Sequence, residues 1–240
     1  MRPAGFWRRC AAWTLDAALV TLPVLLLCRG AMHRAAATFT QSWGALVDAV
    51  AQRMAAMILS PATSASTAPG PGAMTSLARD SLRDPALLAA AADLQSALIG
   101  LLWLPMAVFV TLFLAWCVGF ERSPLQATPG KRALGLRAVD LAGGRIGTGV
   151  ALARFLAGTL SWLSLNIGHL LAGLAPDHAA LHDRLSRTRV VLAPGAPERM
   201  PPWATAWLIV QAVAWLIALA WAAQAMAVPM QAALDRALWG

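Results

Sequence analysis

The stretch CAAWTLDAALVTLPVLLLC, residues 10–28, decides the fold of this chain. At about 1.5 Å per residue in a helix, it is long enough to cross roughly 30 Å of hydrocarbon. Its one charged residue, Asp16, would cost about 2.5–3.5 kcal/mol at the centre of a bilayer. We therefore expect a transmembrane helix in which the Asp16 carboxylate faces protein or water and has a partner.

The composition places the whole chain in a membrane. Of its 240 residues 59% are hydrophobic and 12% are charged, with a mean hydropathy of +0.61, whereas about 25% of the residues of a soluble domain are charged. The net charge of +8 comes almost wholly from arginine, since Lys131 is the only lysine. The basic charge is concentrated outside the apolar runs, and no soluble module is large enough to bind nucleic acid. The basic excess therefore indicates membrane topology and argues against a nucleic-acid partner.

Two further apolar runs predict transmembrane helices. Residues 96–118 form the second span, in a helix expected to start at Asp84 and Pro85, because a capping carboxylate before a proline is typical of a helix N-terminus. Pro105 lies inside this run and is expected to kink it. Residues 203–228 are bounded by prolines on both sides and form the last span.

The segment between the first two runs, residues 29–95, predicts a long loop on the non-cytoplasmic side. Within it, residues 35–59 have a helical composition and a one-sided apolar stripe, which predicts a helix lying on the membrane or on the bundle. Residues 60–73, SPATSASTAPGPGA, have the proline, glycine, serine and threonine content of a flexible linker.

The polar and basic segment 121–149 predicts a small β-hairpin. Residues 134–140 and 145–147 flank residues 141–144, LAGG, whose glycines suit a tight turn. Residues 188–191 contain β-branched side chains and are expected to add a third strand.

Residues 150–175 leave two topologies open. Positive residues favour the cytoplasm, so the N-terminus and the basic loops 120–149 and 176–202 all belong on that side. A single crossing by residues 150–175 would separate the two loops. Either the segment is re-entrant, with a bend near residues 166–168, or it spans and violates the charge rule. We favour the re-entrant form, because it keeps both basic loops on one side and each half would be too short to span.

Three stretches resemble the RDD family of bacterial membrane proteins, which is named for one arginine and two aspartates. They are residues 5–16 (GFWRRCAAWTLD), 128–140 (TPGKRALGLRAVD) and 181–191 (LHDRLSRTRVV). The resemblance implies that Asp16 is the first family aspartate and Asp183 the second. It also implies an RDD-like membrane domain over residues 1–192, with residues 29–95 inserted, followed by an additional transmembrane helix in residues 193–240. Transport, including cation/proton antiport, is proposed for some members, so the resemblance implies a fold more firmly than a function.

Arg9 and Asp16 are the candidate intramembrane polar pair. They are seven residues apart, which is two helical turns, so they share a face about 10 Å apart along the axis. Direct contact needs help from a water or a second cation, and the candidate partners of Asp16 are Arg9, Arg154 and His169. Two interpretations stay open: a carboxylate that exchanges a proton or cation, and a structural ion pair that fixes helix packing.

The second family aspartate, Asp183, is expected to pair with Arg132 or Arg137 as a structural clasp. The supporting site residues are Arg8, Arg132, Arg137, Arg154, His169 and His182. His178 and His182 are four residues apart on an expected helix, but the glutamate of a zinc protease motif is missing. We expect no metal site and no cofactor.

These patterns predict an all-α membrane protein, a polytopic helical bundle with three transmembrane helices, one re-entrant or spanning segment and a small cytoplasmic β-hairpin. We expect it in the bacterial inner membrane with a cytoplasmic N-terminus. One candidate function is transport of ions or small solutes, which would require a homo-oligomer because the spans are few. The other is a non-transporting regulator or assembly factor that contacts a membrane protein partner. No motif indicates enzymatic activity, so none is expected.

Overall fold

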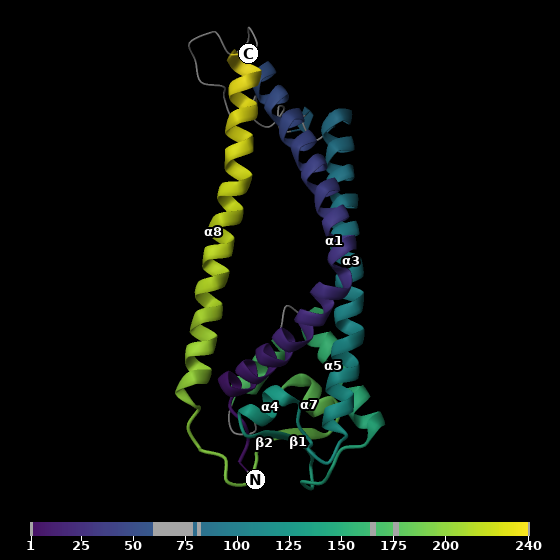
Figure 1. Ribbon diagram of the computed structural model, residues 1–240, viewed down its shortest axis with the longest axis vertical. Coiled ribbons are helices and arrows are strands. Elements are labelled where there is room, and N and C mark those ends of the chain that lie inside the picture. Colours follow the sequence, from purple (N-terminus) through teal and green to yellow (C-terminus); the bar gives the residue numbers. More distant parts are fainter. Residues whose placement is uncertain (1, 60–78, 81–82, 164–166, 175–177, 240) are drawn as a thin grey trace. The chain divides into compact units, whose positions relative to one another are not determined.

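The computed structural model describes residues 2–59, 79–80, 83–163, 167–174 and 178–239. The elements follow one another in the order α1 (Phe6–Ile58), α3 (Pro85–Glu121), α4 (Pro129–Ala133), β1 (Leu136–Asp140), α5 (Thr148–Leu163), α6 (Ile167–Leu170), a 3-10 turn (Leu171–Gly173), α7 (Leu181–Leu185), β2 (Thr188–Leu192) and α8 (Pro202–Trp239), as drawn in Figure 1. The chain divides into two compact units. Unit 1 comprises Met1–Leu26 and Ala107–Val213, and unit 2 comprises Leu27–Met106 and Ala214–Gly240.

Three helices of the described chain, α1, α3 and α8, are long and apolar enough to cross a membrane. They contain the three predicted spans, so the all-α membrane fold class is confirmed. Each of them has a proline in its interior, at positions 23, 105 and 229. Proline within a helix is tolerated at membrane depth because neighbouring groups satisfy the freed backbone carbonyl.

The first helix is longer than the sequence suggested. α1 runs without a break from Phe6 to Ile58, so the first half of the expected loop 29–95 is helical and continues the first span. The helix predicted over residues 35–59 is therefore confirmed as helix but is not a separate element. The start of α3 is confirmed as well: the backbone N–H of Ala86 donates to Asp84 Oδ1 at 2.9 Å. The predicted linker 60–73 lies outside the described residues.

Unit 1 contains a two-stranded antiparallel sheet in which β1 pairs with β2. Leu136 lies opposite Leu192, and Asp140 lies opposite Thr188. The expected partner of β1, residues 145–147, is wrong: the chain around Gly144 forms only a turn, in which the Gly144 N–H donates to Asp140 Oδ1 at 2.7 Å. The strand predicted at residues 188–191 supplies the second strand instead.

The start of α1 packs on one face of this sheet. Ala11 and Ala12 are fully buried and form a cluster with Leu134, Leu136 and Val190. Small side chains at these positions let the helix backbone approach the sheet closely. The residues before α1 extend the sheet by one bridge, since the Ala4 N–H donates to the Val190 carbonyl at 3.0 Å.

The beginning of α8 is tied to α1 within unit 1, where the Trp207 indole N–H donates to Thr14 Oγ1 at 3.0 Å. The end of α3 also reaches the sheet, where Val118 packs against Ala138 of β1. α1, α3 and α8 therefore each have one end beside the same sheet (Figure 1).

In unit 2, the second half of α1 packs against the end of α8. Val47 and Ala51 of α1 are buried against Ala233, and Asp48 forms an exposed ion pair with Arg236 at 3.2 Å. The sequence allowed the 35–59 helix to lie either on the membrane or on the bundle. These contacts show that its second half packs on protein.

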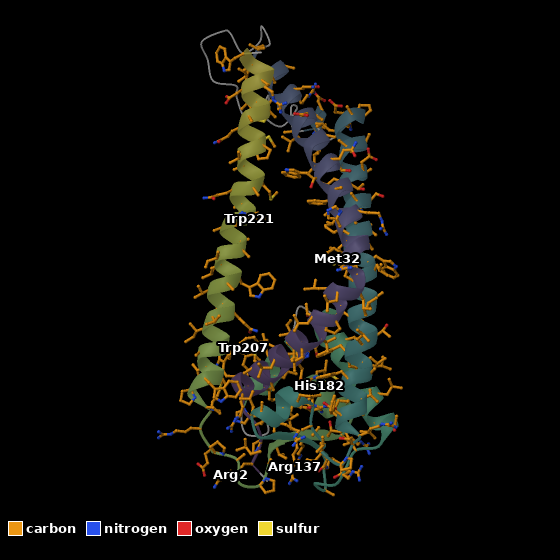
Figure 2. All side chains as sticks on the ribbon, viewed as in Figure 1. Arg2, Met32, Arg137, His182, Trp207 and Trp221 are labelled. Atoms are coloured by element: carbon orange, nitrogen blue, oxygen red, sulfur yellow. The ribbon has the colours of Figure 1, made fainter. Side chains whose placement is uncertain are left out.

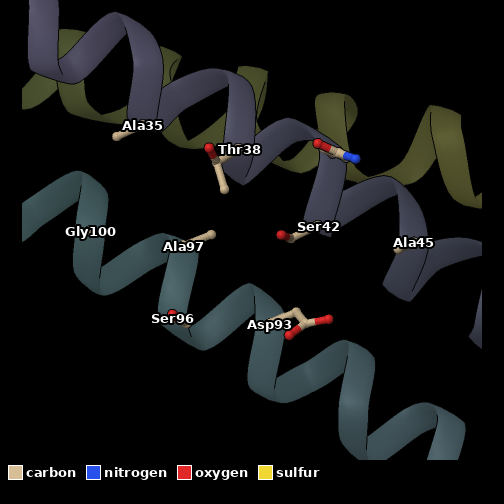
Figure 3. A pocket seen from close by; sticks show the side chains of 9 residues that line it. Ala35, Thr38, Ser42, Ala45, Asp93, Ser96, Ala97 and Gly100 are labelled. Atoms are coloured by element: carbon tan, nitrogen blue, oxygen red, sulfur yellow. The ribbon is translucent and has the colours of Figure 1, made fainter.

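A groove lies between α1 and α3 in unit 2. It is lined by Ala35, Thr38, Gln41, Ser42, Ala45, Asp93, Ser96, Ala97 and Gly100, with a volume of about 490 Å³ (Figure 3). Side chains of the two helices face each other across it, and most of them are small or polar.

Candidate functional site

The Asp16 carboxylate is buried and accepts hydrogen bonds from three neutral donors. Its Oδ1 accepts from the Trp116 indole N–H at 3.0 Å and from the Gly130 backbone N–H at 2.8 Å, and its Oδ2 accepts from Thr128 Oγ1 at 2.5 Å. The residue is 2% exposed. The expectation that protein shelters this carboxylate from lipid is confirmed.

The local sequence Thr128-Pro129-Gly130 explains two of these donors. Thr128 caps the short helix α4, Pro129 occupies its first position, and the free N–H of Gly130 points at Asp16. Gly130 is also needed for space, because a Cβ there would collide with the Ala12 carbonyl oxygen and lie 2.9 Å from Asp16 Cγ. The loop after α3 is therefore shaped around the aspartate of α1.

The structure does not bring Arg9 and Asp16 together. Arg9 Nη2 instead pairs with Asp183 Oδ2 at 2.5 Å, and its Nη1 donates to the His178 carbonyl at 2.8 Å. Arg154 and His169 were the other two expected partners of Asp16. Among the described residues, the hydrogen-bond partners of Asp16 are instead Trp116, Thr128 and Gly130. The long side chain of Arg9 therefore pairs with a carboxylate distant in sequence, Asp183, and not with Asp16, which lies two turns along the same helix.

Asp183 is fully buried and is shared by two guanidinium groups, those of Arg9 and Arg154. It also accepts from the Ala180 N–H at 2.9 Å, which holds the start of α7. The expected partners were different: Arg132 is exposed, and Arg137 lies on β1 (Figure 2). The clasp predicted for Asp183 exists, but its cations come from α1 and α5.

Arg154 extends the ion pairs to a second carboxylate. Its Nε lies 3.3 Å from Glu121 Oε2, and its Nη1 also donates to Thr188 Oγ1 at 2.5 Å. Glu121 in turn pairs with Lys131. The result is a chain of alternating charges, Arg9–Asp183–Arg154–Glu121–Lys131, which we call the ion chain.

The ion chain and Asp16 balance in charge. Arg9, Arg154 and Lys131 are basic, and Asp183, Glu121 and Asp16 are acidic, so the net charge of the six is zero when all are ionised. Ionised side chains removed from water need such compensation, because an unpaired buried charge costs several kcal/mol.

The environment fixes the protonation of the groups near α7. Burial raises the pKa of Asp183, but the guanidinium groups of Arg154 and Arg9 lower it more, so the net pKa is below its usual range. Burial, and then the charge of Arg154, hold the pKa of His182 well below its usual range. Asp183 therefore stays ionised and His182 stays neutral near pH 7. The side chain of His182, labelled in Figure 2, is 13% exposed.

The remaining expected residues have structural contacts. Arg8 donates to the carbonyls of Pro197 at 2.9 Å and Arg199 at 3.1 Å, which anchors the chain before α8. The rings of His169 and His182 lie 5.3 Å apart between centroids. His178 has a φ of 47° and precedes α7, so it does not share a helix with His182. In the described part of the chain, no group of three metal-ligating side chains is found.

Five residues of the site were missed from the sequence: Trp116, Glu121, Thr128, Lys131 and Thr188. Two of them carried a usable signal. Lys131 is the only lysine, and Glu121 is the charged residue that ends an apolar run. The other three are ordinary polar or aromatic residues whose role depends on non-local packing.

Comparisons with known proteins agree with this architecture. The model of the RDD family matches residues 3–187, which include Arg9, Asp16 and Asp183. The chain is also 30% identical over 86 residues to the "Uncharacterized protein YxaI" of Bacillus subtilis (strain 168). That match covers 36% of this chain and 56% of the length of the relative. No solved structure matches the chain. A family match over most of the chain, together with the sheltered aspartates, shows that this protein is a member of the RDD family.

Proposed function

We propose that this RDD-family membrane protein exchanges a proton for a small cation, with Asp16 as the exchanging carboxylate. The observation that carries the proposal is the environment of Asp16. Asp16 is a buried carboxylate on a membrane helix, and its described partners Trp116, Thr128 and Gly130 are neutral. Asp183 and Glu121, in contrast, are paired with basic side chains. An ionisable group within a membrane helix is by default a functional candidate.

A carboxylate held by neutral donors can accept a proton without breaking an ion pair. A proton and a bound cation would neutralise the same charge, so the two would compete for Asp16, and competition of this kind is the basis of exchange. The carboxylates of the ion chain, Asp183 and Glu121, are already paired with basic side chains, so they are not the groups that we propose to exchange.

We also propose the orientation and assembly of the protein. Exposed arginines surround the sheet of unit 1, namely Arg122, Arg132, Arg145, Arg184, Arg187, Arg189 and Arg199. By the positive-inside rule this side faces the cytoplasm of a cell with the protein in its inner membrane. The described residues supply three membrane helices, which are few for a carrier, so we also propose a homo-oligomer. It includes no cofactor and no enzymatic activity.

The test compares everted vesicles that contain the wild type, Asp16→Asn or Asp48→Asn at equal abundance. Asp48 is the matched control, because it is an exposed carboxylate on the same helix. We expect addition of sodium or potassium to dissipate a preformed pH gradient in the wild type and in Asp48→Asn but not in Asp16→Asn. Equal flux in all three would refute the role of Asp16, and no flux in the wild type would refute transport.

The groove of unit 2 favours a second candidate function, a non-transporting regulator or assembly factor. Its exposed polar side chains, Thr38, Gln41 and Asp93, suit a polar segment of a membrane protein partner. In that case Ala97→Trp, which fills the groove, would abolish co-purification of one defined partner, while the wild-type vesicles would show no cation-dependent flux.

A further inference from the structure

The outer side of α5 is more apolar than its buried side. The buried side carries Arg154 and Ser161, which are 5% and 0% exposed, together with the small residues Ala151 and Ala157, which are 2% and 8% exposed. Its outer side carries Leu152, Leu156 and Leu160, which are 40%, 53% and 49% exposed. Residues four apart lie on one face of a helix, so the leucines form a continuous stripe. An apolar outer stripe over a charged inner side is favourable where the surroundings are apolar.

Both ends of the segment that contains α5 are held at one place. β1 ends just before it and β2 begins just after it, and the two strands pair along their full length, from Leu136 opposite Leu192 to Asp140 opposite Thr188. Residues 141–187 therefore leave and return to the same sheet. A segment with both ends on one side of a bilayer crosses it an even number of times.

α5 is also too short to cross. Its 16 residues give a length of about 24 Å at 1.5 Å per residue, less than the roughly 30 Å of hydrocarbon. A single crossing is excluded by the strand pairing, and a double crossing is excluded by this length.

The chain after α5 folds back on it. Gly168 of α6 is buried, and a Cβ at this position would collide with Ser161 Oγ of α5 and lie 2.9 Å from the Leu181 Cβ. This close approach packs α6 against α5 and the start of α7. Irregular backbone at membrane depth is tolerated when protein covers it in this way.

We propose that α5 and α6 form a re-entrant hairpin whose leucine stripe contacts the acyl chains of the membrane leaflet next to the sheet. The hairpin enters and leaves on the side of the N-terminus, so the described part of the chain crosses the membrane three times, in α1, α3 and α8, and α8 ends on the opposite side. This inference does not depend on the transport proposal. Figure 1 shows α5 and the two strands in the same part of unit 1.

The first arm of the test measures on which side the ends of the hairpin lie. In a background where Cys10, Cys28 and Cys117 are replaced by serine and abundance is retained, Arg145→Cys and Arg187→Cys are labelled with a membrane-impermeant maleimide. Both positions are exposed and flank the hairpin. We expect both to react in inverted vesicles and neither to react in intact spheroplasts. Labelling of the two positions from opposite sides would overturn the proposal.

The second arm measures lipid contact directly. Leu156→Cys and Leu141→Cys each carry an environment-sensitive fluorophore in the same background, reconstituted with phospholipids that are spin-labelled in their acyl chains. The two leucines are matched, since both are 53% exposed and Leu141 lies in the turn after β1. We expect at least twofold stronger quenching at position 156. Equal quenching would overturn the proposal, including the case in which a second copy covers the leucine stripe.

Discussion

Replacing Asp183 by asparagine tests the ion chain at its most connected carboxylate. The substitution keeps the size of the side chain but removes the charge that Arg9 and Arg154 share, and both guanidinium groups are almost fully buried, with side chains 12% and 6% exposed. Breaking a buried pair costs about 3–5 kcal/mol, because the remaining charge is left uncompensated. Two cations lose their partner here, so we expect the upper part of that range.

This loss is large compared with the stability of a typical protein, about 5–15 kcal/mol. For a chain of this size, 1 kcal/mol corresponds to roughly 2–4 °C in Tm, so a loss of about 4–5 kcal/mol in Asp183→Asn should lower Tm by about 8–20 °C. The assay is thermal unfolding of the detergent-purified protein, followed by the fraction that stays monodisperse.

Asp48→Asn is the control for the same chemical change at an exposed pair. Asp48 and Arg236 are 52% and 71% exposed, and a surface pair of this kind contributes about 0–1 kcal/mol. If Asp183→Asn lowers Tm no more than Asp48→Asn does, the ion chain does not hold unit 1 together and the reasoning is refuted. The double variant Arg9→Gln/Asp183→Asn should lose less than the sum of its single variants, because the two residues share one interaction.

Three further outcomes follow from the same contacts. Gly130→Ala should push α4 away from α1 and cost about 1–3 kcal/mol in stability through the lost hydrogen bond to Asp16, whereas Gly149→Ala, at a helical site with open space, should not lower Tm in the same assay. Trp116→Phe removes one donor to a charged acceptor and should cost about 1.5–3 kcal/mol, and Tm unchanged from the wild type would contradict the indole hydrogen bond. The folded state keeps His182 neutral while the unfolded chain takes a proton below about pH 6.5, so Tm should fall from pH 7 to pH 5, and His182→Gln should flatten that fall. The lowered pKa of Asp183 adds a second loss only as the pH falls below about 4.

The parts of the fold that local sequence determines were predictable. Apolar runs of sufficient length predicted all three membrane helices, and the Asp84–Pro85 pair predicted the first residue of α3. The end of α1 was not predictable from charge alone. The apolar run stops at residue 28, and the loop was expected from residue 29, but a helix can continue beyond its apolar run, and here it continues to Ile58.

Strand pairing and ion pairing were predicted less well, because both are non-local. The glycines at 143 and 144 make a turn after β1, yet the strand that pairs with β1 comes after α5, α6 and α7. Helical spacing placed Arg9 and Asp16 on one face, but spacing says nothing about which distant carboxylate competes for the guanidinium. Asp16 already accepts hydrogen bonds from three neutral donors. The guanidinium group of Arg9 therefore pairs with the other buried carboxylate, that of Asp183.

The ion chain also explains why unit 1 has one arrangement rather than several. Each of its members comes from a different element: Arg9 from α1, Asp183 from α7, Arg154 from α5, Glu121 from α3 and Lys131 from α4. Apolar residues at these positions would stabilise packing about as well, but they would tolerate a shift of one helix against another. The ion chain does not tolerate such a shift, because moving any one element by a turn would separate opposite charges and leave buried charges uncompensated. The half-inserted hairpin of α5 and α6 is short and its outer face meets fluid lipid in our proposal, so its one buried charge, Arg154, links it to α1 through the Asp183 carboxylate that Arg154 shares with Arg9.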